Sequence, residues 1–217
     1  MDFVFEQIRV GGDRNFGYLV GDRKAKLAVA IDPAFAPELF SERAGAQGLE
    51  ITHILNTHGH SDHVNGNARL KELTGATVGA YKDSHVGPEL ALDDGDTVDV
   101  GSLTLRVLYL PGHSPDHLVF HLAEQRVAIT GDLLFVGKIG GTATEEEART
   151  EYASLRRLLQ ELPADTTIWP GHDYGCRPAS TIALELLVNP FLQAPDYGSF
   201  LGLKADWAAF KAQHGLA

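Results

Sequence analysis

Short apolar runs separated by glycine and aspartate turns fill the first part of the chain and its middle. Runs of this length, bounded by such turn residues, are typical of β-strands. The pattern predicts strands at residues 3–10, 16–20, 27–31, 51–56, 98–100, 103–110, 118–121, 127–130 and 167–169.

Helical spacing is clearest between Thr144 and Pro163. Thr144 and Glu147 match a capping box, in which each side chain can bond the other's backbone N–H. The apolar positions that follow recur about every 3.6 residues, and they are Ala148, Tyr152, Leu155, Leu159 and Leu162. Weaker patterns predict helices at residues 37–46, 67–73, 181–188 and 205–211.

The order of these elements predicts an α+β fold, in which two β-rich halves are each flanked by helices. Together with the motifs described below, this order favours a four-layer αββα sandwich. We expect a single domain over residues 1–217, with residues from about 178 to 217 as a short C-terminal helical extension. Trp207 and Phe210 fall on one face of the last predicted helix, so the sequence is compatible with an oligomer.

Composition narrows the class of protein. The chain has 217 residues, of which 44% are hydrophobic and 22% charged, as is usual for a globular domain. It contains no apolar stretch of about 18 residues, so we expect no membrane-spanning helix. It begins without a basic region before an apolar run, and its one cysteine, Cys176, cannot form an internal disulfide. We therefore expect a cytoplasmic protein with no membrane partner.

The net charge of −11 and the isoelectric point near 5.3 bear on the kind of partner. No run of lysine and arginine offsets this charge locally, so the chain would repel a phosphate backbone. We therefore expect no nucleic acid as a partner. A small anionic substrate is compatible with the charge, because it needs only two or three local cations.

The densest group of metal-ligand residue types directly follows the strand predicted at 51–56. It contains His58, His60, Asp62 and His63, spaced by a glycine and a serine. Such small residues allow the backbone to fold closely around an ion, whereas three protonated imidazoles within six residues would repel one another. This grouping predicts a metal site.

Three further candidates each follow a predicted strand and a glycine: His113, Asp132 and His172. Strand ends at one edge of a β-sandwich converge, so we expect these residues to join the first group. Five histidines and two aspartates are too many for one tetrahedral ion and suit two ions that share a carboxylate. We assign one ion to His58, His60 and His113, the other to Asp62, His63 and His172, and both to Asp132.

Two such ions about 3.5–4 Å apart can lower the pKa of a shared water toward about 7, which would give a hydroxide nucleophile. Asp62 and Asp132 are therefore predicted to be catalytic as well as metal-binding. We expect zinc. Iron and manganese are alternatives, because histidine and aspartate also bind these metals.

These motifs resemble the metallo-β-lactamase superfamily over residues 17–190. The similar segments are Thr-His-Gly-His-Ser-Asp-His-Val-Asn-Gly at 57–66, Pro-Gly-His-Ser at 111–114, Thr-Gly-Asp at 130–132 and Pro-Gly-His-Asp-Tyr-Gly at 170–175. The resemblance implies the αββα sandwich and the same ligand set.

Asp132 resembles the bridging aspartate of the glyoxalase II-like branch, which true metallo-β-lactamases lack. His60 stands where flavodiiron oxygen reductases carry glutamate, and the acidic charge disfavours the RNA-processing members. Two branches remain, and both act on glutathione derivatives. Glyoxalase II hydrolyses the thioester of hydroxyacyl-glutathione. The resemblance to persulfide dioxygenases implies instead a single iron held by His58, His113 and Asp132.

Several segments look like the dioxygenases, among them residues 15–23 and 28–33. Other features differ from that group: His117 stands where the dioxygenases often have cysteine, and Lys138 lies three positions before the family's basic residue. Only 45 residues follow His172, so we expect the long helical domain with which classical glyoxalase II binds glutathione to be incomplete.

Mechanism favours the hydrolase. A metal can polarise a thioester carbonyl, and a thiol with a pKa of about 8.5 leaves without a strong acid. We therefore expect a thioester hydrolase similar to hydroxyacylglutathione hydrolase, with a mononuclear-iron glutathione persulfide dioxygenase as the alternative. A lactonase or another ester hydrolase is a further alternative, and a non-catalytic metal-binding regulator is a different class.

The candidate substrate-binding residues are Lys138, Tyr174 and Arg177. The two cations could bind an anionic tail such as that of a glutathione derivative, and the resemblance to glyoxalase II implies that Tyr174 contacts the substrate. Asp32, at a strand end, could orient a ligand histidine or cap a turn. His117 is expected to be structural.

Overall fold

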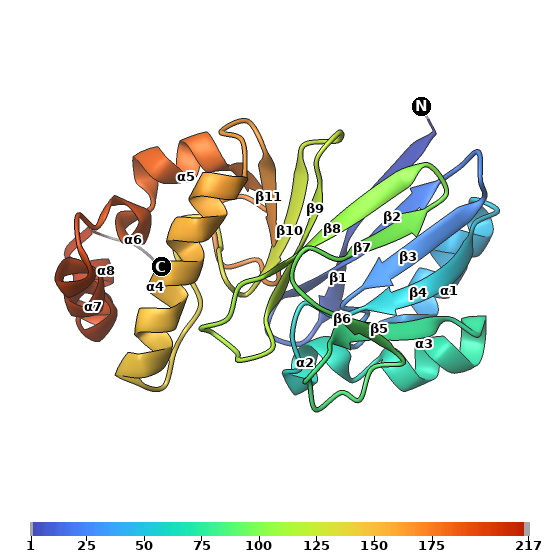
Figure 1. The fold of residues 1–217 in the computed structure, drawn as a ribbon, viewed down its shortest axis with the longest axis horizontal. Coiled ribbons are helices and arrows are strands. Elements are labelled where there is room, and N and C mark those ends of the chain that lie inside the picture. The colour runs from blue at the N-terminus through green and yellow to red at the C-terminus, as the bar shows by residue number, and fades with distance from the viewer. Residues whose placement is uncertain (1, 215–217) are drawn as a thin grey trace.

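Two six-stranded β-sheets form the centre of the protein, of which the computed structural model describes residues 2–214 (Figure 1). The first sheet holds, in spatial order, β1 (Phe3–Gly11), β2 (Asn15–Asp22), β3 (Leu27–Ile31), β4 (Glu50–Leu55), β5 (Thr77–Tyr81) and β6 (Leu90–Leu92). The second holds β12 (Ser180–Thr181), β11 (Thr167–Pro170), β10 (Val127–Gly131), β9 (Leu118–Leu122), β8 (Leu103–Tyr109) and β7 (Thr97–Val100). Strands β3 to β6 run parallel, as do β10 and β11, and the other neighbours are antiparallel.

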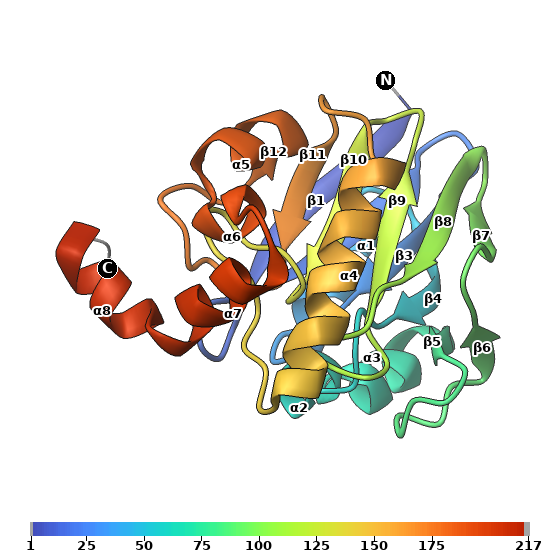
Figure 2. The ribbon, with the colours of Figure 1, turned by 60° about the vertical axis from the view of Figure 1, so that its left-hand side comes forward.

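Helices cover the outer face of each sheet (Figure 1). On the first sheet lie α1 (Pro37–Ala46) and α3 (Asn67–Thr74), and the one-turn helix α2 (Ser61–Val64) follows β4. On the second sheet lie α4 (Glu145–Glu161), α5 (Ile182–Val188), α6 (Pro190–Gln193) and α7 (Tyr197–Ala205). Figure 2 shows α8 (Trp207–His214) at the outer edge, beyond α7. The predicted four-layer αββα sandwich is confirmed.

Alternation along β2 explains how one strand serves two apolar cores. Tyr18 and Val20 point between the sheets, where they share a core with Phe120 of the second sheet. Leu19 points the other way, into the core under α1 and α3, because successive strand residues face opposite sides. A third core, which includes Phe200, lies between the second sheet and its helices. The strands of both sheets, which the predicted metal ligands follow in sequence, are therefore packed on both faces.

The sequence pattern does not predict β5 and β6. Strand β5 contains a glycine and β6 has three residues, so neither gives a clear apolar run. Their backbones continue the parallel pairing that starts at β3 and β4. Pairing with a neighbour that is distant in sequence decides these strands, and local propensity does not record it.

The helix predicted at residues 205–211 is wrong in its bounds. Helix α7 ends at Ala205 and α8 begins at Trp207, with Asp206 between them and neither proline nor glycine to mark the break. Trp207 packs on Phe191 with ring centroids 4.8 Å apart, so part of the predicted apolar face rests on the chain itself. Residues 215–217 of the expected extension lie outside the described residues. Among the helices of residues 2–214, none has the length and apolar character needed to cross a membrane.

Candidate metal centre

The seven candidate ligands follow the ends of four strands. The group at 58–63 follows β4, His113 follows β8, Asp132 follows β10 and His172 follows β11. Because β10 and β11 are parallel neighbours, their carboxyl ends place Asp132 and His172 side by side. Pairing of β3 with β4 likewise places Asp32, just after β3, beside the start of the His58 loop.

His58, His60 and His113 form a first trio. The Nε2 atom of His58 lies 3.0 Å from Nδ1 of His60, which lies 3.1 Å from Nε2 of His113. In a tetrahedral zinc site with Zn–N distances of about 2.0–2.1 Å, neighbouring nitrogens are about 3.3 Å apart. The three nitrogens therefore have the spacing of ligands around one ion.

Asp62, His63 and His172 form a second trio of the same kind. The Nε2 atoms of the two histidines are 3.3 Å apart. Oδ2 of Asp62 lies 3.6 Å from the first of them and 3.5 Å from the second. The histidines are buried, whereas the Asp62 side chain is 36% exposed, so this trio opens to solvent on the aspartate side.

Asp132 lies within reach of both trios. Its Oδ2 is 3.2 Å from Nε2 of His172 and 3.5 Å from Nε2 of His113, and its Oδ1 is 3.5 Å from Nε2 of His63. Oδ1 is buried and has no hydrogen-bond partner among the described residues. A buried carboxylate oxygen without a partner is costly. This position fits a cation shared between the trios.

Four of the five histidines turn Nδ1 away from the cluster and place it against an oxygen atom. The pairs are His58 with the Thr57 hydroxyl at 3.1 Å, His63 with Asp32 at 3.1 Å, His113 with the Gly141 carbonyl at 2.8 Å, and His172 with the Asp13 carbonyl at 2.9 Å. Because these oxygens accept, Nδ1 carries the proton and Nε2 keeps a lone pair that faces the cluster. Asp32 therefore orients a histidine, which is one of the two roles expected for it.

Charge within the cluster favours a cation. Burial lowers the pKa of His58 well below its usual value and also lowers the pKa of His113, so both rings are neutral near pH 7. Burial opposes a charge on His63 as well, but the carboxylates of Asp132 and Asp32 raise its pKa well above the usual value. Burial would raise the pKa of Asp132, yet the nearby histidines hold it well below the usual range. A metal ion would replace the proton on His63, as it does at other sites where binding releases protons.

Besides the Nδ1 partners, two further residues that contact the donor set are not predicted as such by the sequence. His117 accepts the backbone N–H of Asp132 at Nε2, 3.1 Å away, and burial lowers the pKa of His117 to about 3, so the ring is a neutral acceptor. Asn15 donates to Oδ2 of Asp62 at 2.9 Å. The expectation that His117 is structural thus misses its contact with a candidate ligand, and Asn15 is 47 positions from its partner, so no local pattern connects them.

The structure brings two of the three candidate substrate-binding residues to the cluster. The Tyr174 ring stacks on His172, with centroids 4.6 Å apart and planes 4° apart, and Nζ of Lys138 lies 4.2 Å from the Tyr174 centroid. The Tyr174 hydroxyl donates to Asp13 at 2.6 Å. Arg177 is exposed, and its side chain makes no hydrogen bond or ion pair within residues 2–214.

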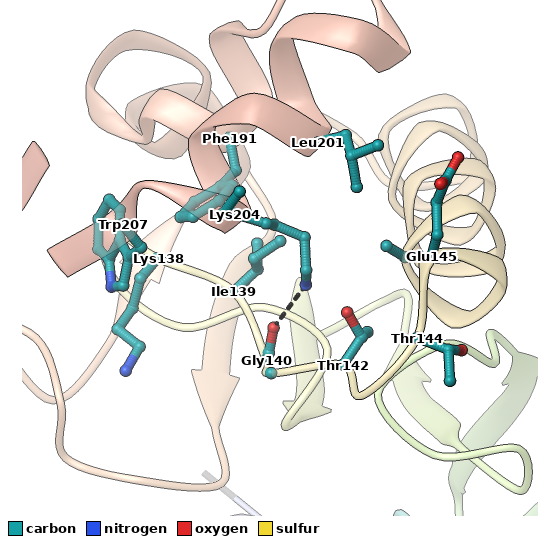
Figure 3. A pocket seen from close by; sticks show the side chains of 13 residues that line it. Lys138, Ile139, Gly140, Thr142, Thr144, Glu145, Phe191, Leu201, Lys204 and Trp207 are labelled. Atoms are coloured by element: carbon teal, nitrogen blue, oxygen red, sulfur yellow. Dashed lines mark hydrogen bonds between the residues drawn. The ribbon is translucent and has the colours of Figure 1, made fainter. Parts of the chain in front are cut away.

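A pocket of about 360 Å³ opens beside the cluster, between the loop at 138–144 and the C-terminal helices (Figure 3). Gly141, whose carbonyl bonds His113, lines it together with Lys138 and the apolar side chains of Phe191 and Trp207. Burial lowers the pKa of Lys138, and the nearby charge of Lys211 acts in the same direction. The pocket therefore combines apolar walls with charged side chains, namely Lys138, Lys204 and Glu145.

Comparison with known proteins places this geometry in a family. Residues 11–172, which include all seven clustered residues, match the profile of the Metallo-beta-lactamase superfamily. The hydroxyacylglutathione hydrolase of Methylococcus capsulatus is 39% identical over 164 residues, which are 74% of this chain and 62% of that protein. The human mitochondrial persulfide dioxygenase ETHE1 is 35% identical over 184 residues, which are 82% of this chain and 71% of that protein. The chain thus spans less than two thirds of the first of these relatives.

The crystal structure of ETHE1 from Myxococcus xanthus has the same fold, with a TM-score of 0.86 and 32% identity over 94% of this chain and 91% of that one. The sandwich, the histidine and aspartate cluster at its edge and the family profile agree with one another. The chain belongs to the metallo-beta-lactamase superfamily, and its histidine and aspartate cluster has the donor atoms and the spacing to hold metal ions.

Proposed function

We propose that the protein is a thioester hydrolase that uses two divalent metal ions. The observation that carries this proposal is the second trio, Asp62, His63 and His172, whose ligand atoms lie 3.3 to 3.6 Å apart and which Asp132 joins to the first trio. A single ion could not use all seven donors, because a site of this kind binds about four to six ligands. We propose zinc as the metal, with iron or manganese as alternatives that the same donors accept.

Each group of the cluster has a separate role in the proposed hydrolysis. Two bound ions would supply Lewis acidity for the thioester carbonyl and lower the pKa of an attacking water. Asp132 would hold both trios in register, and Asn15 fixes the carboxylate of Asp62 on the solvent side. The thiol product has a pKa of about 8.5 and leaves without a strong acid. The chemistry therefore needs no protein residue beyond those already in place.

We further propose that the pocket beside the cluster receives an anionic part of the substrate, as in a glutathione derivative. One relative is named a hydroxyacylglutathione hydrolase, and the pocket offers Lys138 beside apolar walls. Tyr174 forms the boundary between the pocket side and the metal cluster, because it contacts both Lys138 and His172. Arg177 remains a sequence-based candidate without a contact that supports it.

Substitution of Lys138 tests the pocket proposal. Lys138→Met should raise KM for lactoyl-glutathione about tenfold and leave kcat nearly unchanged, because a hydrogen bond to a charged group contributes about 1.5–3 kcal/mol to binding. Lys24→Met, which removes an exposed cation in a turn between β2 and β3, is the matched control and should keep both constants. An unchanged KM in Lys138→Met would place the substrate tail elsewhere.

A mononuclear-iron persulfide dioxygenase is the second candidate function. The human relative of that name and the similarity to the Myxococcus xanthus ETHE1 structure favour it. Under this proposal His58, His113 and Asp132 would hold one iron, and the second trio would hold no catalytic ion.

Two assays on one metal-loaded sample separate the candidates. Thiol release from lactoyl-glutathione, without oxygen uptake on glutathione persulfide, is the result expected for the hydrolase. Oxygen uptake on the persulfide without thiol release would overturn it. Hydrolysis of a lactone but not of the thioester would instead retain the hydrolytic chemistry and change the substrate.

A further inference from the structure

Helix α4 buries a charged residue on the face that packs against the second sheet. Glu151 has no exposed surface, and its Oε1 has no hydrogen-bond partner among the described residues. The apolar pattern that predicts this helix gives no sign of a buried carboxylate. Burial raises the pKa of Glu151 to about 7. Because burial disfavours the charged form of a carboxyl group, a charged Glu151 needs a cation in contact with it.

That partner is Lys204 of α7, whose side chain is 12% exposed and whose amine contacts Oε2 of Glu151. The same amine donates to the carbonyl of Gly140 at 3.0 Å, and Figure 3 shows it directed at that carbonyl. Lys204 therefore joins α4, the C-terminal helix α7 and the loop at 138–144 at one point.

His113 lies between the loop at 138–144 and helix α4, the two segments that Lys204 contacts together with its own helix. On one side, the carbonyl of Gly141, next to Gly140, accepts the Nδ1 proton of His113. On the other side, a Cβ on Gly112 would lie 2.4 Å from the Cα of Glu151, so the backbone before His113 rests directly on α4. Ser154, one turn along α4, donates to the carbonyl of Pro111 at 2.6 Å and holds the same segment.

We propose that Glu151 and Lys204 form a positioning pair for His113. Lys204 holds Gly140, and through it the Gly141 carbonyl that sets the tautomer and direction of the His113 ring. The pair therefore sets the metal affinity of the trio His58, His60 and His113. The proposal rests on the proposed function in one respect, because it takes His113 to be a metal ligand.

Stability alone does not account for the pair. Replacing a buried ion pair with apolar side chains of similar volume is often neutral or stabilising. Groups that orient a ligand histidine, in contrast, commonly change metal affinity about 10- to 100-fold when they are replaced. The two roles therefore give different results in the double variant Glu151→Leu/Lys204→Met, which keeps the volume and removes the contact with Gly140.

Zinc binding to the metal-free protein tests the proposal, measured at pH 8 by competition with a chromophoric chelator, with thermal unfolding followed in parallel. We expect Glu151→Leu/Lys204→Met to unfold within a few degrees of wild type and to lose about 10- to 100-fold in affinity for one of two zinc ions. The conservative single variant Lys204→Arg keeps the positive charge and should retain most of the wild-type zinc affinity. Lys71→Met/Glu89→Leu removes an exposed ion pair away from the cluster and should bind zinc like wild type.

Wild-type zinc affinity in Glu151→Leu/Lys204→Met would overturn the positioning role. If that variant does not fold, Lys204→Met alone gives the same test, because the raised pKa of Glu151 allows the carboxyl to become neutral. His113→Ala separates this result from a failure of the metal site itself. If His113→Ala binds zinc like wild type, His113 is not a ligand and the proposed two-metal function fails first.

Discussion

Asp132→Ala should remove activity almost completely, with a fall in kcat of at least about a thousandfold on any substrate. Its carboxylate is the group that reaches both trios, and without it His63 and His172 each lose one of their carboxylate partners. The bound metal should fall from two ions per chain to one or none. Steady-state kinetics and metal analysis on the same preparation measure both effects. Because Asp132 also belongs to the single-iron alternative, this variant tests the cluster and does not choose between the two reactions.

A matched control separates loss of the cluster from loss of the fold. Asp22 is also a buried aspartate, but it accepts hydrogen bonds from Ser102 and from the turn after β2, with no histidine among its partners. Asp22→Asn should unfold at a lower temperature and keep two metal ions. If Asp132→Ala retained two ions and normal turnover, the shared-carboxylate arrangement would be wrong.

Gly171→Ala should lower activity about a hundredfold through a single methyl group. A Cβ at this position would lie 2.2 Å from Oδ1 of Asp132 and 2.9 Å from Cε1 of His63, so the two candidate ligands must move apart. Overpacking of this kind costs about 1–3 kcal/mol of stability, whereas a shift of about 1 Å at a reacting centre can cost two orders of magnitude in rate. Activity should therefore fall more steeply than the melting temperature.

Gly45→Ala is the control for this substitution. Gly45 is exposed in α1, and a Cβ there would meet no atom within 4 Å. The change should leave activity unaltered and raise stability by up to about 1 kcal/mol, because alanine favours a helix over glycine. Normal zinc affinity in Gly171→Ala would mean that the cluster tolerates displacement and that close spacing is not required.

The donor set could be predicted because its signal is local. Each of His113, Asp132 and His172 follows a strand and a glycine, and the strands end at the same edge of the sandwich. Alternation and helical spacing predicted most of the strands and helices, and the motifs together with their resemblance to the superfamily predicted the four-layer arrangement. Strands β5 and β6 were not predicted, because the pairing of β5 with β4 and of β6 with β5 is a tertiary property.

Apart from Asp32, the groups that orient the donors could not be predicted. The Nδ1 partners of His113 and His172 are the backbone carbonyls of Gly141 and Asp13. Every residue has such a carbonyl, so the residue type does not indicate which one is the partner. The contact between Glu151 and Lys204 spans 53 positions, and the helical pattern of α4 describes its apolar residues alone. Sequence therefore indicates which residues can bind a metal, and tertiary structure decides how each one is held.

The most direct test of the two-metal hydrolase is a titration of metal-free protein with zinc, in which thiol release from lactoyl-glutathione is followed against ions bound per chain. We expect turnover to stay low until the second ion binds and to reach its maximum at two ions per chain. Full activity at one ion per chain, or oxygen uptake on glutathione persulfide after reconstitution with one iron and no thiol release at any metal content, would contradict the account.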